Sequence, residues 1–257
     1  MKITVFGSGG AAGVPSVSAG WGDADPAEPR NRRLRSSILV EDEDTRILVD
    51  TSPDLRQQLL RSGVRRLDAV LFTHAHADHV HGIDDLREIN RVLGHGLPAW
   101  SDQATFDDLH KRFAYVFTGV PEGAPVYRPW LLPNLVTPRF SIGDIEIQSW
   151  TQGHGWVHSL GFRFGDFAYT TDALTLGDDV FEIVRGAKVW MVGALTNRPN
   201  PLAHANVEIA VGWIERAGVE RGILTHLGGG LDYQTLRRIL PPHIEPAFDG
   251  MEIEIQV

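Results

Sequence analysis

Four of the chain's eleven histidines lie close together in residues 73–81, whose sequence is THAHADHVH. An apolar run at residues 69–72 precedes this segment and predicts a strand that leads into it. Imidazole nitrogens and carboxylate oxygens bind divalent ions such as zinc and manganese, and a tight loop after a strand can direct several of them at one point. We therefore predict metal ligands at His74, His76, Asp78 and His79.

The spacing of these four residues predicts two ions rather than one. His74 and His76 are two apart in an extended segment, so their side chains point the same way and can share an ion. Asp78 and His79 lie on the following turn and can reach a second ion. The alternative is a surface loop that contains histidine by chance, but it does not explain so many ligands directly after a buried strand. Zinc or manganese suits these ligands, and iron is also possible.

The motif His74-x-His76-x-Asp78-His79 resembles the signature of the metallo-β-lactamase superfamily, most of whose members are binuclear hydrolases. The resemblance implies an α/β fold, a four-layer αββα sandwich, formed by residues 1–257 as a single domain. It also implies three further ligands from the ends of later strands, namely His154, Asp172 and His226. One ion is then held by His74, His76 and His154, and the other by Asp78, His79 and His226, with Asp172 bridging the two.

The resemblance also implies a reaction. A metal-bridging hydroxide is a nucleophile at neutral pH, because a cation can lower the pKa of bound water from 15.7 to about 7, and Asp78 would orient it. Residues 9–15, 82–87 and 248–251 resemble the phosphodiesterase branch, and more narrowly the phosphoribosyl 1,2-cyclic phosphate phosphodiesterases. This favours opening of a small cyclic ribose-phosphate or nucleotide diester. His204 is the candidate proton donor to the leaving oxygen, and an ordinary histidine at a helix entry is the alternative.

Several alternatives remain open. The same metals could hydrolyse a carboxylic ester, thioester or lactone, or the chain could bind a metal or nucleotide without turnover. His158 competes with His154 for the third-histidine position, and His154 is preferred because its Gln-Gly-His-Gly context resembles the ligand loop of the family.

Two features depart from the narrower group. With no cysteine in the chain, thiolate ligands and disulfides are excluded. The cyclic-phosphate enzymes usually bind a structural zinc through cysteines, where this chain has residues 21–26, so we expect that site to be absent. After His226, where relatives often carry another histidine, the chain has Leu227 and three glycines, which predicts a mobile or open loop.

Composition limits the partners. A chain of 257 residues with 42% hydrophobic residues can bury a large core. The net charge of −9 opposes binding of long nucleic acid and favours a small phosphorylated substrate, and a homodimer stays possible. The start of the chain predicts a strand, and no run approaches the ~18 apolar residues of a membrane span. We therefore expect a soluble, cytoplasmic protein without a membrane partner.

Periodicity predicts alternating strands and helices. We expect a hairpin over residues 36–50, a helix from Ser52 and Pro53 to Gly63, a second hairpin with strands 160–164 and 167–170, and a helix over residues 205–216.

Three further sets of residues have alternative roles. Residues 7–13 could bring backbone N–H groups to a phosphate or form a tight turn. Arg30, Arg32, Arg33 and Arg35 could bind phosphate or RNA, but a solvated surface segment is favoured. Four tryptophans could line a pocket, although a core role is more usual: Trp100, Trp130, Trp150 and Trp156.

Overall fold

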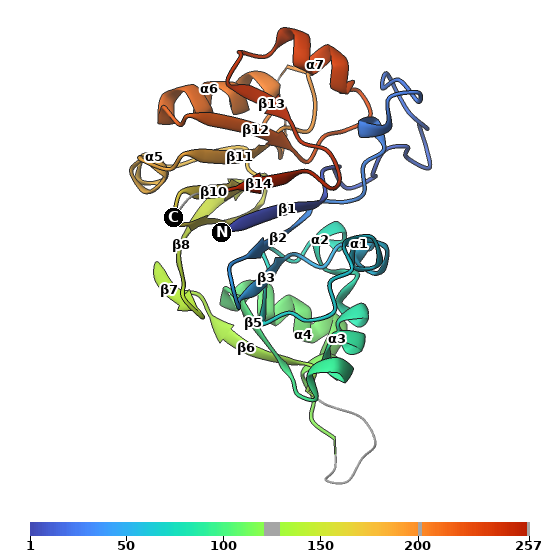
Figure 1. Ribbon diagram of the computed structural model, residues 1–257, viewed down its shortest axis with the longest axis vertical. Helices are drawn as coiled ribbons and strands as arrows, with labels where there is room; N and C mark the ends of the chain where they lie inside the picture. Colours follow the sequence, from blue (N-terminus) through green and yellow to red (C-terminus); the bar gives the residue numbers. More distant parts are fainter. Residues whose placement is uncertain (121–128, 200–201, 256–257) are drawn as a thin grey trace.

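Two seven-stranded β-sheets pack face to face between two layers of helices in this computed structural model (Figure 1). The structure describes residues 1–120, 129–199 and 202–255. The first sheet has the strand order β14 (Glu252–Glu254), β1 (Lys2–Gly7), β2 (Ser37–Glu41), β3 (Arg46–Val49), β4 (Ala69–Leu71), β5 (Leu97–Ser101) and β6 (Leu131–Leu135). The second has the order β13 (Ile244–Pro246), β12 (Arg221–Thr225), β11 (Val189–Gly193), β10 (Phe167–Thr170), β9 (Val157–Phe164), β8 (Ile145–His154) and β7 (Arg139–Ile142).

The two sheets share one pattern of strand directions. In each sheet, four neighbouring strands pair antiparallel and the remaining strands pair parallel: β14 to β3 and then β3 to β6 in the first, β7 to β10 and then β10 to β13 in the second. Parallel strands need long crossovers, and here helices supply most of them. The carboxyl ends of β8, β10, β11 and β12 therefore lie at the same edge of the second sheet.

Helices cover the outer face of each sheet (Figure 1). Those of the first half are α1 (Leu55–Ser62), α2 (Ala77–Val80), α3 (Leu86–Leu93) and α4 (Gln103–Phe117), with short 3₁₀ helices η1 (Pro29–Asn31) and η2 (Ile83–Asp85). Those of the second half are α5 (Asp178–Val184), α6 (Val207–Ala217) and α7 (Tyr233–Ile239). None of the helices in the described ranges is long and apolar enough to cross a membrane.

Strand β3 explains why the fold needs four layers. Its residues Ile47 and Val49 pack between the two sheets, whereas Leu48 faces the helices, and all three are fully buried. A strand buried on both faces must be apolar throughout, as this one is after Arg46. Three apolar clusters result, one between the sheets and one under each helical layer. The four-layer αββα prediction is confirmed.

The predicted local elements are largely present. Strands β2 and β3 form the first hairpin, and β9 and β10 form the second. The helix predicted from Pro53 begins two residues later, at Leu55, because the Ser52 hydroxyl accepts the N–H of Asp54 in a turn before the helix. The helix predicted from residue 205 begins at Val207, where Asn206 caps it by accepting the N–H of Ile209.

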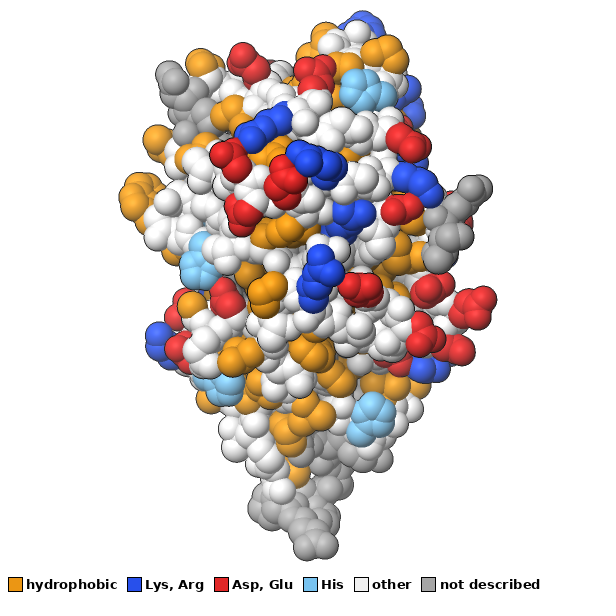
Figure 2. All heavy atoms as spheres, turned by 90° about the vertical axis from the view of Figure 1, so that its left-hand side faces the viewer, with side chains coloured by type: hydrophobic (Ala, Val, Ile, Leu, Met, Phe, Trp, Pro, Cys, Tyr) orange, Lys and Arg blue, Asp and Glu red, His pale blue; other side chains and the backbone are white. Residues whose placement is uncertain are grey.

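Charges of both signs are mixed on the surface. On the face shown in Figure 2, Lys and Arg side chains lie among Asp and Glu side chains rather than forming one continuous basic field. This mixture suits an acidic chain of net charge −9, in which basic side chains are the minority.

Candidate metal centre

The predicted ligands come from four separate strand ends. Those of residues 74–79 follow β4, His154 ends β8, Asp172 follows β10 and His226 follows β12. The structure gathers them into two groups, in each of which the ligand atoms lie within 4.8 Å of one another. The first group is His74, His76, His154 and Asp172, and the second is Asp78, His79, Asp172 and His226. All seven predicted ligands are thus brought together in the predicted arrangement.

Asp172 belongs to both groups and presents a different oxygen to each. Its Oδ2 lies 3.8 Å from Nε2 of His74 and 3.6 Å from Nε2 of His154. Its Oδ1 lies 3.2 Å from Nε2 of His79 and 3.2 Å from Nε2 of His226. One carboxylate oxygen directed at each group is the arrangement that a bridging ligand requires.

Three residues of the site have backbones in the left-handed region. Asp50, Asp172 and His226 have φ angles of 65°, 48° and 55°, and they are the non-glycine residues with positive φ in the described part of the chain. Each comes one or two residues after a strand, β3, β10 or β12. Such a conformation costs of order 1–3 kcal/mol for a residue with a side chain. Packing around the site therefore offsets local strain that turns these side chains toward it.

Polar partners hold the second ring nitrogen of three histidines. Nδ1 of His79 lies 2.6 Å from Asp50 Oδ2, and Nδ1 of His154 lies 2.8 Å from the Ala203 carbonyl. Nδ1 of His74 lies 3.0 Å from the hydroxyl of Thr73, which itself donates to Asp50. Such partners fix the orientation of ligand rings in metal sites.

The opposite ring nitrogens of His74 and His79 fit a metal. Nε2 of both rings is buried and has no hydrogen-bond partner among the described residues. A buried nitrogen of this kind needs a partner, and a divalent ion would supply one. The donor set, imidazole and carboxylate without thiolate, suits zinc and manganese.

Asp50 is a site residue that sequence reasoning missed. It is fully buried and holds His79 directly, and its other oxygen accepts the N–H of Thr73 at 2.8 Å. The sequence did contain a signal for Asp50, because it is an acidic residue directly after an apolar run. Asp172 lies in a similar position, two residues after a strand.

The charges of the site favour bound cations. Burial lowers the pKa of His74 and of His76, so both imidazoles are neutral, which is the form that binds metal. Burial opposes ionisation of Asp172, but the neighbouring His226 and His79 hold its pKa well below the usual range. Burial also opposes a charge on His79, yet Asp172, Asp50 and Asp78 raise its pKa well above normal. The carboxylates around His79 thus favour a positive charge at this position, and a bound cation would take the place of the His79 proton.

His204 lies beside the two groups. Its Nδ1 is 3.5 Å from Oδ2 of Asp172, its ring stacks on His226 with centroids 5.0 Å apart, and it meets His154 edge-on at 4.6 Å. The side chain is 21% exposed, and burial lowers its pKa to about 4. The candidate proton donor therefore lies next to the predicted ligands and is accessible, and its lowered pKa makes the imidazole neutral at pH 7 before an anionic substrate binds.

His158 lies outside both groups, and its Nε2 contacts Asp102 Oδ2 at 2.6 Å. The hairpin register gives the reason. His154 pairs with Val157 across the two-residue turn, whereas His158 pairs with Gly153. Neighbouring residues on a strand face opposite sides, so His154 and His158 point to opposite faces of the hairpin.

The glycine-rich stretch near the amino terminus forms a tight turn. The N–H groups of Gly9, Gly10 and Gly13 donate to the carbonyls of Leu34, Leu227 and Gly10, and the N–H of Ser8 donates to Asp249. These donors are already used by the protein, so the phosphate role suggested for this stretch is wrong for them.

The arginine segment and the glycine loop after His226 contact each other. Arg33 is buried rather than solvated, and its guanidinium donates to the Gly228 carbonyl at 3.2 Å. The Gly229 carbonyl accepts the N–H groups of Asp23 and Ala24 at 2.9 and 3.1 Å. The expectations of a solvated segment at Arg33 and of an open loop after His226 are therefore corrected.

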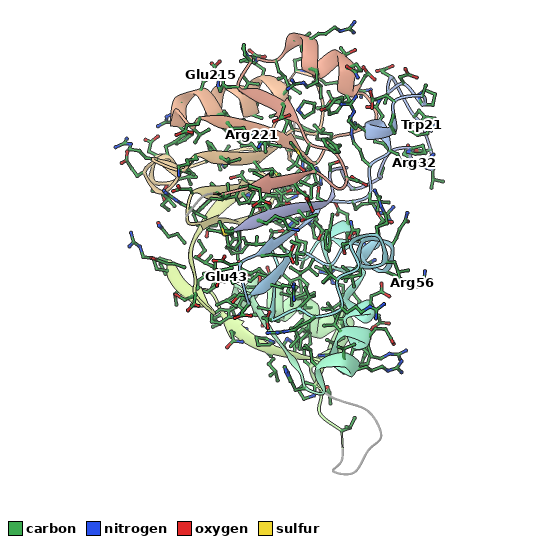
Figure 3. The ribbon with its side chains drawn as sticks, viewed as in Figure 1. Trp21, Arg32, Glu43, Arg56, Glu215 and Arg221 are labelled. Atoms are coloured by element: carbon green, nitrogen blue, oxygen red, sulfur yellow. The ribbon has the colours of Figure 1, made fainter. Side chains whose placement is uncertain are left out.

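The other three arginines also have protein partners. Arg30 pairs with Glu28 at 2.7 Å and Arg35 with Asp54 at 3.1 Å. Arg32 lies over the ring of Trp21, 5.0 Å from its centroid, at the edge of the molecule (Figure 3).

The four tryptophans differ in their surroundings. Trp130 and Trp150 are buried in the core, and Trp100 stacks on Phe140. Trp156 is almost fully exposed.

The αββα fold and two His/Asp groups that share a carboxylate define a metal-dependent hydrolase. A model of the beta-lactamase superfamily domain matches residues 45–227. The chain belongs to the metallo-β-lactamase superfamily.

Individual relatives differ in their functions. The chain is 33% identical over 255 residues to an octanoyltransferase of Porphyromonas gingivalis; the match covers 98% of this chain and 51% of that protein, so the chain spans about half of its length. It is 29% identical to a crystal structure described as a new diphosphatase from the PhnP family, with a TM-score of 0.90 over 100% of this chain and 98% of that one. Zinc-bound PqqB from Methylobacterium extorquens, 17% identical with a TM-score of 0.79 over 99% and 100% of the two chains, shares the fold.

Proposed function

We propose that this protein is a binuclear phosphodiesterase that cleaves a small cyclic ribose-phosphate or nucleotide diester. The observation that carries this proposal is the position of His204, which lies 3.5 Å from Asp172 without being needed for either ligand group. An alkoxide is a poor leaving group, so its departure from phosphorus needs a proton, and a histidine at the edge of the metal centre can donate it. The likeness to a PhnP-family diphosphatase supports phosphoryl chemistry.

Each of the two ligand groups would hold one metal ion. One ion would be held by His74, His76 and His154 and the other by Asp78, His79 and His226, with Asp172 shared between them. Two bound ions, zinc or manganese with iron also possible, would activate water and polarise a phosphoryl oxygen. Asp78 would orient the attacking water. His204 would protonate the leaving oxygen once the bound phosphate anion has raised the pKa of its imidazole. A small phosphorylated molecule is the proposed partner.

Metal removal tests the proposal first. Protein purified without chelators should contain about two divalent ions per chain, one for each group, by elemental analysis. It should cleave bis-p-nitrophenyl phosphate, lose this activity after chelation and regain it when zinc or manganese is restored. Asp78→Ala should abolish cleavage with the circular dichroism spectrum unchanged, whereas Asp107→Ala, an acid on α4 outside both groups, should leave activity intact. Full activity after metal removal or in Asp78→Ala would reject the mechanism.

Hydrolysis of a carboxylic ester or thioester is the second candidate. The 33% sequence identity to an octanoyltransferase supports this second candidate, although the chain spans about half of that protein. A screen of p-nitrophenyl octanoate beside bis-p-nitrophenyl phosphate separates the two candidates. Metal-dependent cleavage of the octanoate alone would replace the phosphodiesterase proposal.

A further inference from the structure

A pocket of about 410 Å³ opens beside the first ligand group. His74 and the exposed His76 line it on the side of the ligand group. Ala104, Thr105 and Arg112 of α4 and the tip of the β8–β9 hairpin also line it. Ligand pockets in proteins fall in the range of about 300–1,000 Å³. The space is therefore large enough for the part of a substrate that extends away from the reacting phosphate.

Trp156 lies at the rim of this pocket and is 93% exposed. An isolated exposed aromatic has no special meaning by itself, but this one is two residues from His154 and separated from it only by the turn residue Gly155. The position of the turn is fixed, because the register pairs His154 with Val157 and the Gly155 Cα packs against Ala203, where an added Cβ would lie 3.1 Å from that methyl group. The hairpin thus defines the backbone position of Trp156 beside the centre and leaves its ring exposed for contact with a ligand.

Polar groups complete the pocket. The Arg112 guanidinium donates to the Ala75 carbonyl at 2.5 Å, which holds it against the loop between His74 and His76. Asp108 and His158 also line the pocket, and His158 pairs with Asp102 at 2.6 Å. An aromatic surface with a few polar groups is the usual lining of pockets that bind small organic molecules.

We propose that this pocket binds the nucleoside part of the substrate, with the nucleobase stacked on Trp156. The proposal rests on the proposed phosphodiesterase function and narrows its substrate to nucleotide diesters. Every nucleobase has a π-face, so stacking on one tryptophan supports binding of bases in general rather than of a particular base. An acyl chain is the other occupant that the exposed ring could contact, and the experiment below distinguishes it.

Two diesters with the same leaving group test the proposal. Thymidine 5′-p-nitrophenyl phosphate carries a nucleoside, and methyl p-nitrophenyl phosphate does not. In the metal-loaded wild type the ratio of their kcat/KM values should favour the nucleotide. Trp156→Ala should lower this ratio roughly 5- to 100-fold, mainly through KM, because stacking on an aromatic ring contributes an affinity of that size. Trp156→Phe should keep most of the ratio, and Leu60→Ala, an exposed apolar residue on α1, should leave it unchanged.

Binding of thymidine 5′-monophosphate by titration calorimetry gives a second readout that does not depend on turnover. Trp156→Ala should weaken it by a similar factor. An unchanged ratio with unchanged binding, or equal loss on both diesters, would overturn the stacking role while leaving the phosphodiesterase intact. A Trp156→Ala effect on p-nitrophenyl octanoate relative to the acetate, without one on the nucleotide, would overturn it in favour of an acyl chain. Wild-type protein that binds the nucleotide through Trp156 but cleaves neither diester would reject the phosphodiesterase alone.

Discussion

At the scale of single residues, the metal centre depends on side chains that are turned inward by an unfavourable backbone. Asp50, Asp172 and His226 each have positive φ just after a strand, where the chain must leave the sheet. The sequence marks none of them with glycine, because each position needs its side chain for function. The strain is offset by packing and hydrogen bonds around the centre, such as the two that Thr73 donates to the Asp50 carboxylate.

Removal of the Asp50 carboxylate should weaken metal binding. In Asp50→Ala, His79 loses the partner at 2.6 Å that fixes its ring, so we expect metal affinity to fall by roughly 10- to 100-fold, measured by competition with a chromophoric chelator. Asp50→Asn should lose less metal affinity, because its amide oxygen can accept a hydrogen bond from His79 and asparagine tolerates positive φ. Equal affinity in Asp50→Ala and wild type would show that His79 is oriented by other contacts.

Loss of the His204 ring should affect substrates according to their leaving groups. In His204→Ala, diesters with alkyl leaving groups should slow by about 10²- to 10⁴-fold, because they need a proton. Aryl diesters such as bis-p-nitrophenyl phosphate should slow far less. Steady-state rates on both classes check this, and equal slowing would remove the proton-donor role.

At the scale of elements, two hairpins of the second sheet place parts of the site. The β8–β9 turn has Gly155 and Trp156 at its centre, and the β9–β10 turn has Gly165 and Asp166. Both glycines have positive φ, 59° and 53°, at the first central position, as a type II′ turn requires. Only the first turn touches the centre, through Ala203, whose carbonyl accepts from His154.

This pair of turns permits a matched comparison. Gly155→Ala and Gly165→Ala should each lower the free energy of unfolding by about 1 kcal/mol or more, because alanine is strained at positive φ. Gly155→Ala should also reduce metal affinity, since its new methyl group would press on Ala203, whereas the nearest atom to the added Cβ at Gly165 is 4.0 Å away on Met1. Urea unfolding and chelator competition measure the two effects. A loss of metal affinity in both variants would point to a general loosening of the sheet.

At the scale of the whole molecule, the two ends of the chain join. Strands β1 and β14 pair, Asp249 accepts from Ser8, and residues 25–31 contact α7. Two carboxylates in the contact between residues 25–31 and α7 have lowered pKa values. A hydrogen bond from Arg30 lowers the pKa of Glu28 to about 2. Burial raises the pKa of Asp232, but hydrogen bonds from Asn31 and Thr235 outweigh it and lower this pKa to about 2.

These shifts give a pH dependence with a definite sign. A carboxyl whose pKa is lower in the folded state stabilises the fold above its unfolded value, 4.5 for Glu28, and this contribution disappears as pH falls toward 2. We expect the free energy of unfolding of the wild type to fall in that window, and the difference between wild type and Glu28→Gln to shrink as pH falls. Urea unfolding at a series of pH values measures it. A difference that stays constant from pH 6 to pH 2.5 would contradict the assignment.

The ligand cluster of residues 73–81 could be predicted from the sequence alone, because contiguous ligands after an apolar run are local information, and the fold class followed from the family resemblance that this motif carries. The sequence also indicated both hairpins and two helices, whose apolar spacing is local too. One domain over residues 1–257, a homodimer and the absence of a long nucleic-acid partner stay predictions. Only tertiary structure decided that His154 faces the centre and His158 does not, that Asp50 holds His79, and that Arg33 is buried. These outcomes depend on strand register and on contacts between residues distant in sequence, which spacing along the chain does not specify.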